Sequence, residues 1–145
     1  MELLSDSIGF QINLTARSLR TALEKRLSDV GITPTQWMIM MVLGEKNSLN
    51  QTDLSKRLNL DPTTITHNLD KLENLNLLQR NQDKDDRRTQ NVSLTNKGVR
   101  SYVEWMRLGE EVNRIAAEGL NSEDRTRFIM WLNRVYSNLT IFNGK

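Results

Sequence analysis

The sequence contains no cysteine and only one histidine, His67, among its 145 residues. The lack of cysteine excludes disulfides, thiol-based redox sensing and cysteine-ligated zinc. One histidine also leaves too few ligands for a zinc site, because such sites usually combine several His or Cys side chains. We therefore expect no metal site and no other cofactor.

Long apolar runs are absent too, since no segment approaches the roughly 18–20 apolar residues that span a bilayer. The N-terminal segment lacks the basic-then-apolar order of a signal peptide. The sequence also has no paired nucleophile and base, no phosphate-cradling glycine loop and no cluster of metal ligands. These absences predict a soluble, cytoplasmic protein that has no membrane partner, no catalytic residues and no enzymatic activity.

Proline and glycine are scarce, with two and seven residues, so helical periodicity dominates the chain. Apolar spacing predicts a first helix that starts near Ile8 and ends at Gly31. A second helix is expected after Thr33 and Pro34, a cap followed by an N1 proline. Further helices are predicted over about 51–58, 62–75, 95–119 and 121–142, capped by Asn50, Asp61, Thr95, and Asn121 or Ser122.

Residues 50–75 form two short helices joined by a turn through Asn59 and Leu60, the length that a helix-turn-helix uses. A helical wheel places Ile65, Leu69 and Leu72 of the second helix on one apolar seam. The opposite, solvent-exposed face carries hydroxyls, an imidazole and a lysine, which suit base edges and phosphates in a major groove. These side chains are Thr63, Thr66, His67, Asp70 and Lys71.

The solvent-exposed face has a second interpretation, in which the threonines only cap the helix and His67 is an ordinary solvated residue. Asp70 argues against DNA, because a carboxylate on a groove face meets phosphates. Lys71 or an arginine of the following hairpin would have to neutralise it.

Two short alternating runs, 77–80 and 91–94, flank a strongly charged loop and predict a hairpin, the wing of a winged helix. Arg87 and Arg88 in this loop suit a narrow minor groove, and Asp86 would hold an arginine in a fixed rotamer. The chain's basic excess lies in the same part: residues 50–100 hold nine basic and seven acidic side chains, whereas the flanking parts are balanced. An ordinary solvated charged loop gives the same pattern.

Four segments in the right order resemble the MarR family over about residues 10–140. They are Gly31 to Trp37, Leu54 to Leu58, Thr63 to Thr66, and Asp86-Arg87-Arg88 followed by Val92-Ser93-Leu94-Thr95 and Gly98. The resemblance implies a mainly α fold with a small β-hairpin wing. It implies a single protomer over 1–145, with a winged helix-turn-helix lobe over 35–100 and dimerisation helices over 1–30 and 101–145.

The resemblance also assigns roles to residues. Thr63, Thr64, Thr66, His67 and Lys71 would contact DNA from the recognition helix. Arg88 would enter the minor groove, positioned by Asp86, with Arg87 near the backbone. Asn50, Gln51 and Thr52 would offer donors to phosphate at a helix N-terminus.

This chain departs from the family at two positions. Asn76 stands where the family usually has a glycine after the recognition helix, and asparagine is the next residue most tolerant of a left-handed backbone. His67 stands where arginine is more frequent, which changes the expected base preference and adds a group that titrates near its usual pKa of about 6.5.

Apolar stripes on the first and last helices predict a homodimer, since stripes of that size usually mark an interface. The last helix carries Phe128, Trp131, Leu132, Val135, Leu139 and Phe142, and the first offers Ile8 and Ile12. An intramolecular bundle of the terminal helices is the alternative. In a dimer, two recognition helices would match half-sites about 34 Å apart.

The resemblance further suggests a small aromatic or anionic effector between the lobes. Its pocket would be lined by Arg17, Trp37, Met38, Met41, Tyr102 and Met106, although such residues at helical spacing also form plain core. We therefore expect a regulator, a repressor released by such an effector, that binds a pseudo-palindromic operator in double-stranded DNA. A winged-helix module that binds another protein instead of DNA is the alternative function.

Overall fold

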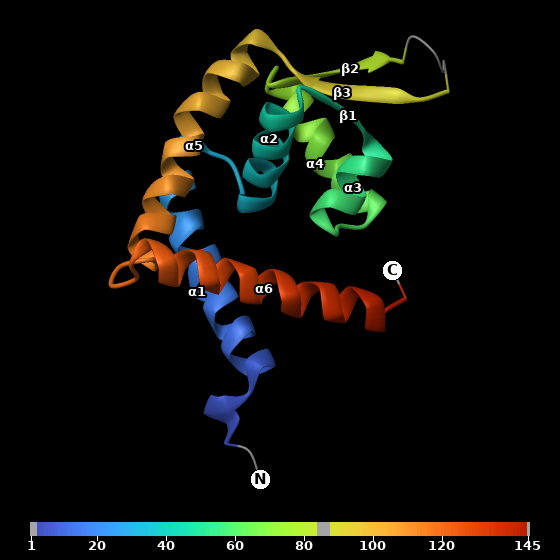
Figure 1. Ribbon diagram of the computed structural model, residues 1–145. Helices are drawn as coiled ribbons and strands as arrows, with labels where there is room; N and C mark the ends of the chain where they lie inside the picture. Colours follow the sequence, from blue (N-terminus) through green and yellow to red (C-terminus); the bar gives the residue numbers. More distant parts are fainter. Residues whose placement is uncertain (1–2, 84–87, 145) are drawn as a thin grey trace. The chain divides into compact units, whose positions relative to one another are not determined.

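The computed structural model describes residues 3–83 and 88–144. It is mainly helical, with one small antiparallel sheet, as expected from the sequence (Figure 1). The chain forms two compact units, Met1–Val112 and Asn113–Lys145. In the described part, no helix is both long and apolar enough to cross a membrane.

The first unit contains α1 (Ile8–Leu27), α2 (Pro34–Lys46), α3 (Gln51–Leu58) and α4 (Pro62–Asn74). Two short 3-10 turns, Leu4–Asp6 and Ser28–Val30, flank α1. The strands are β1 (Ser48–Asn50), β2 (Leu78–Gln82) and β3 (Gln90–Leu94). Helix α5 (Asn96–Ala116) begins in this unit, and the second unit contains α6 (Ser122–Phe142).

The predicted caps explain where most helices begin. Thr33 forms a capping box with Gln36 at the start of α2, where Pro34 takes the N1 position. Asn50 and Asn121 accept hydrogen bonds from backbone N–H groups three residues ahead, at 2.8 and 2.9 Å. Gly31 closes the end of the first helical segment with a φ of 74°. The predicted helix boundaries are therefore confirmed to within a few residues.

The sheet has one strand more than the predicted hairpin. Strands β2 and β3 pair antiparallel with Leu78 opposite Leu94, and β1 adds to the other side of β3 with Leu49 opposite Val92. The strand order is therefore β1-β3-β2, with β3 in the centre. A three-residue strand between two helices is too short to show alternation, which is why the sequence did not reveal β1.

The hydrophobic core lies among α2, α3, α4 and the base of the sheet. Ile65, Leu69 and Leu72 of α4 are completely buried, as the predicted seam requires. Burying a side chain of this size contributes about 1.5–3 kcal/mol. The seam thus fixes which face of α4 points to solvent. The other fully buried large side chains are Leu27, Ile39, Met40, Leu43, Leu54, Leu78 and Val92.

Helix α5 begins directly against the turn between α4 and β2. Asn76 holds that turn with a φ of 58°, as its predicted tolerance of a left-handed backbone allows. The Thr95 hydroxyl donates to the carbonyl of Asn76 at 2.7 Å and accepts from the N–H of Gly98 at 3.0 Å. A Cβ on Gly98 would lie 1.9 Å from the carbonyl oxygen of Leu77. The spacing from Thr95 to Gly98 therefore reflects a direct contact of helix and turn.

Replacing Gly98 by alanine should therefore destabilise the fold strongly. The new methyl group would meet backbone rather than a movable side chain, so we expect a loss of about 3 kcal/mol, the upper end of the range for overpacking. Chemical denaturation followed by circular dichroism measures this loss. The matched control is Gly9→Ala on α1, where a Cβ meets only the Ser7 hydroxyl at 4.0 Å. Equal stability of the two variants would contradict the close contact.

Candidate nucleic-acid interface

The exposed face of α4 carries the side chains predicted to contact DNA. Thr63, Thr66, His67 and Lys71 are all exposed, on the side opposite the buried seam. Thr64 differs, because it is half-buried and its hydroxyl donates to Asp61 at 2.5 Å. The structure thus presents four of the five predicted helix residues to solvent together, and their contacts with DNA remain predictions.

Asp61 sets the start of α4. Its carboxylate accepts the side-chain hydroxyl of Thr64 and, at 2.8 Å, the backbone N–H of the same residue. These hydrogen bonds, the hydroxyl first, lower the pKa of Asp61 below its usual 3.8. The ionised cap therefore fixes the first turn, on which Thr63 lies.

Helices α3 and α4 are joined across the turn by polar contacts. The Gln51 amide donates to the Thr66 hydroxyl at 2.5 Å, and that hydroxyl donates to the carbonyl of Pro62 at 2.9 Å. Asn59 turns the chain with a φ of 49°, and the Ser55 hydroxyl donates to the carbonyl of Leu60 at 2.5 Å. Gln51 and Thr66, two residues predicted to contact DNA, are thus held by each other.

Arg80 on β2 neutralises the acidic side of α4. Its guanidinium lies 2.6 Å from the Asp70 carboxylate and also pairs with Glu73. The Arg80 side chain is mostly buried, with 18% exposed, so this fork is held more firmly than a surface ion pair. The sequence offered Lys71 or an arginine of the hairpin as the partner of Asp70. In the structure the partner is the hairpin residue Arg80. Helix α4 and strand β2 are thereby clamped together.

The base of the wing lies next to the start of α3. A hollow of about 390 Å³ is lined by residues 50–53 on one side and 88–90 on the other. Asn50, Gln51, Thr52 and Arg88 of the predicted site thus border one space, and the N-terminus of α3 offers N–H groups and a positive dipole end there. Asp86 and Arg87, the other wing residues in the prediction, lie outside the described residues.

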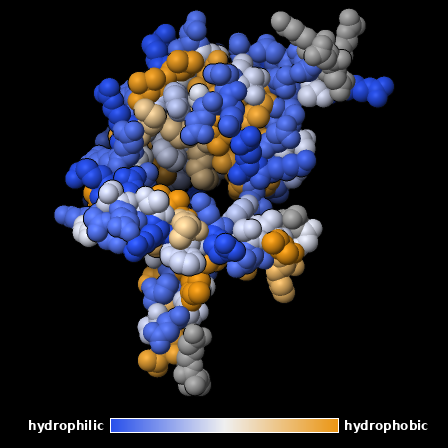
Figure 2. Space-filling view, in the orientation of Figure 1, coloured by the Kyte–Doolittle hydropathy of each residue, from blue (hydrophilic) through white to orange (hydrophobic). Residues whose placement is uncertain are grey.

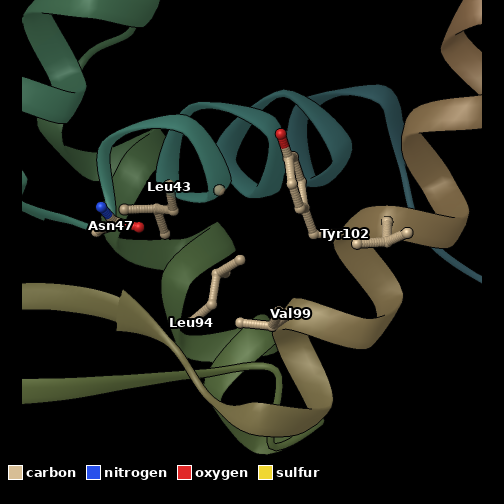
Figure 3. A pocket seen from close by; sticks show the side chains of 7 residues that line it. Leu43, Asn47, Leu94, Val99 and Tyr102 are labelled. Atoms are coloured by element: carbon tan, nitrogen blue, oxygen red, sulfur yellow. The ribbon is translucent and has the colours of Figure 1, made fainter.

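The residues predicted to line an effector pocket lie on α1, α2 and α5, and their contact with an effector remains a prediction. The Trp37 indole packs on Gly109, where a Cβ would lie 2.2 Å from the ring, and its N–H donates to the carbonyl of Trp105 at 2.9 Å. Met38 and Met41 are half-buried on α2, whereas Arg17 is exposed on α1 and Met106 on α5. Tyr102 lines a cavity of about 250 Å³ together with Leu43, Leu94 and Val99 (Figure 3).

Most of the predicted interface residues on the two terminal helices are exposed. On α6 every predicted residue except the half-buried Val135 is exposed, and α6 buries none of its side chains. On α1, Ile8 is exposed and Ile12 is half-buried. Figure 2 shows apolar side chains at the surface toward the end of α6 and on the first half of α1.

Comparisons of sequence point to one family. The model of the MarR family matches residues 32–89. The HTH-type transcriptional regulator FarR of Neisseria gonorrhoeae is 30% identical over 107 residues, which cover 74% of this chain and 71% of that protein. The uncharacterised HTH-type transcriptional regulator YybA of Bacillus subtilis is 26% identical over 129 residues, or 89% of this chain and 86% of the other.

Solved structures share the fold. A probable transcriptional regulator from Pseudomonas aeruginosa matches with a TM-score of 0.81 and 29% identity, covering 92% of this chain and 99% of its own. A cysteine-to-serine mutant of MarR from E. coli, complexed with operator DNA, matches with a TM-score of 0.81 and 22% identity. The match covers 93% of this chain and 99% of that one. BpsR of Bordetella bronchiseptica, whose DNA binding is regulated by 6-hydroxynicotinic acid, matches with a TM-score of 0.85 and 20% identity. The match covers 94% of this chain and 97% of that one.

Because Asp61 caps α4 with a charged side chain, the stability of the fold should depend on pH in the acidic range. Because the folded pKa of Asp61 is lowered, its charge stabilises the fold above the usual value of 3.8 and ceases to do so as pH falls through the folded value. Replacing Asp61 by asparagine keeps a cap but removes the charge. We expect the wild type to be more stable at pH 6, with the difference vanishing toward pH 2. Urea denaturation across this range measures it, and a difference independent of pH would contradict the charged cap.

Proposed function

The chain belongs to the MarR family of transcriptional regulators, and we propose that it binds a pseudo-palindromic operator in double-stranded DNA as a homodimer and represses transcription. Members of this family are transcription regulators and not enzymes. The observation that carries the proposal is the exposed polar face of α4, which Arg80 clamps to the strand of the neighbouring wing.

The charges and shapes of the described residues support a duplex as the ligand. The face of α4 offers hydroxyls, an imidazole and the Lys71 ammonium, while Arg80 offsets the carboxylates of Asp70 and Glu73. Side chains of this kind hydrogen-bond to base edges and phosphates. The relative from E. coli crystallised with operator DNA shares this fold. A cytoplasmic location follows from action on DNA.

Selection of bound sequences from a pool of random duplexes tests the proposal directly. Purified full-length chain should enrich one motif made of two inverted half-sites about one helical turn apart. Enrichment of no motif, at low ionic strength and with folded protein, would contradict sequence-specific binding. Half-sites that are related to each other by two-fold symmetry would in addition support the dimer.

Replacing Arg88 by alanine should weaken binding to the selected duplex. Loss of one arginine from a groove costs about 1–3 kcal/mol, so we expect an affinity about 5- to 150-fold lower by fluorescence anisotropy. The matched control is Arg107→Ala, which removes the same charge from an exposed position on α5 away from the candidate interface. If both variants bind as tightly as the wild type, the wing does not contribute.

The dimer is proposed from the uncovered apolar side chains of α6. Trp131 and Leu139 remain 61% and 54% exposed in the isolated chain, which is costly unless a second surface covers them. A two-fold arrangement would present two recognition helices to the two half-sites. It would also double the modest net charge of +2 per chain.

Replacing Leu139 by glutamate should therefore convert the dimer into monomers. A carboxylate buried at a symmetric apolar interface occurs twice and lacks a partner, so association should weaken by more than a hundredfold. Analytical ultracentrifugation measures the dissociation constant. The control Ser137→Glu adds the same charge at an exposed position on the same helix. A wild type that is monomeric at micromolar concentration would exclude the dimer.

For release of the operator we propose a small lipophilic or aromatic effector. Support comes from the relative whose DNA binding is regulated by 6-hydroxynicotinic acid, together with a cavity next to the sheet of this chain. An effector acts only if its affinity differs between DNA-competent and incompetent states. Addition of such a molecule to the complex with the selected duplex should then raise the dissociation constant.

A further inference from the structure

Helices α2 and α5 contact each other through two aromatic rings, each of which lies on a glycine of the other helix. The Trp37 indole of α2 packs on Gly109 of α5, where a Cβ would lie 2.2 Å from the ring. The Tyr102 ring of α5 packs on Gly44 of α2, where a Cβ would lie 2.4 Å from two ring atoms. Figure 3 shows Tyr102 reaching from α5 toward α2. Each helix therefore supplies one ring and one space for a ring.

The two contacts match in spacing and in direction. Trp37 and Gly44 are seven residues apart on α2, and Tyr102 and Gly109 are seven residues apart on α5. Seven residues make about two helical turns, or roughly 10.5 Å, so the ring and the glycine of each helix lie on the same face. The order of the contacts makes the two helices antiparallel. Two contacts this far apart fix both the position of α5 along α2 and its rotation about its own axis.

A hydrogen bond strengthens the contact at Gly109. The Trp37 indole N–H donates to the carbonyl of Trp105 at 2.9 Å, one turn before Gly109, and both of these α5 residues are buried. Glycine is less favourable than alanine inside a helix, so the space that the two rings need explains why Gly44 and Gly109 are there. A Cβ at Gly109 would force ring and helix apart by at least an ångström, because ordinary contacts begin at 3.4 Å.

Helix α5 connects two parts of the chain that have different roles in the proposed function. It begins just after β3, a strand of the wing, and continues past Val112, where the first unit ends. Helix α4 belongs to the first unit, and α6, which carries most of the apolar side chains of the proposed dimer, follows α5. In a two-fold dimer, the separation of the two α4 helices therefore depends on how each first unit is held on its own α5.

We propose that Trp37 and Tyr102 are positioning residues, which hold α5 in one register on α2, and that this register sets the half-site spacing that the protein accepts on DNA. We call the two ring–glycine contacts the register lock. The lock itself is a property of the first unit, whereas its effect on half-site spacing rests on the proposed function. Packed helices change between discrete arrangements rather than deforming continuously, so a lost contact favours a different register.

A distance measured inside one chain tests the register lock without DNA. The sequence has no cysteine, so Lys56→Cys on α3 and Arg107→Cys on α5 place two nitroxide labels at exposed positions. Arg107 lies about 200° around the helix from Gly109, which keeps its label away from the contact. Pulsed electron paramagnetic resonance is recorded on labelled chain diluted with unlabelled chain. We expect one narrow distance distribution for the wild-type contacts, and a displaced or broader one when Gly109→Ala is added.

A second substitution tests whether the ring is the cause. Trp37→Leu removes the ring that the new methyl group meets, so its combination with Gly109→Ala should restore the narrow distribution. Gly44→Ala with Tyr102→Leu is the equivalent pair if the first variants fold poorly. Gly9→Ala is the control, because a Cβ there meets nothing closer than 4.0 Å. An unchanged distribution in the single glycine variant, or no recovery in the double variant, would overturn the register lock.

The effect on DNA is measured with duplexes that carry the selected half-sites at different separations, changed by one base pair, about 3.4 Å, at a time. The wild type should prefer one separation. In Gly109→Ala we expect the preference for this separation over its neighbours to fall at least about fivefold, or the optimum to move, and Trp37→Leu to restore it. A merely structural role would lower the affinity for every separation by the same factor, and that result would refute the role in spacing.

The two experiments separate this proposal from the proposed function. If no duplex is bound, the proposed function fails, and the distance measurement still decides whether the register lock exists. If the selected duplex is bound and the preferred separation is equally sharp in all variants, the proposed function stands and the positioning role fails.

Discussion

The buried seam of α4 is the constraint on which the rest of the structure depends. Ile65, Leu69 and Leu72 are fully enclosed by the core, and this fixes the rotation of the helix about its own axis. Because a helix with one face buried must expose the other, Thr63 and His67 necessarily point to solvent. The polar clamp from Arg80 then ties this helix to the wing, so that the two parts of the candidate interface are held as one surface.

Local signals in the sequence predicted most of the fold. Side-chain caps such as Asn50, Asp61 and Thr95 act within three residues, so the sequence alone showed where helices begin. Asn76 was assigned its left-handed turn for the same local reason. Features made by distant residues were not predicted: the strand β1, which pairs with β3, and the contact of the Trp37 ring with Gly109. In the sequence, a glycine within a helix only lowers the predicted helix propensity. Its packing role becomes visible once the side chain that lies against it is known.

The candidate site was predictable to the extent that it lies on one helix face. The exposed side of α4 followed from the spacing of the apolar seam, whereas the identity of the arginine that offsets Asp70 depended on how β2 packs. The predicted effector pocket could not be derived in this way, since aromatic and methionine residues at helical spacing form core and pocket alike. In the structure the Trp37 ring packs on Gly109, and Leu43, Val99 and the end of β3 line a cavity.

The dependence of DNA affinity on salt tests the central claim most directly. A duplex held by lysine and arginine contacts to phosphates releases counterions, so the logarithm of the binding constant should fall linearly with the logarithm of salt concentration, by about 0.9 per phosphate contact. With about two to three phosphate contacts from each of two copies of the α4 and wing surface, the account predicts a slope of about −4 to −5 with the selected duplex. A slope near zero, or no binding to any duplex at low ionic strength, would contradict it and favour a protein partner for this face.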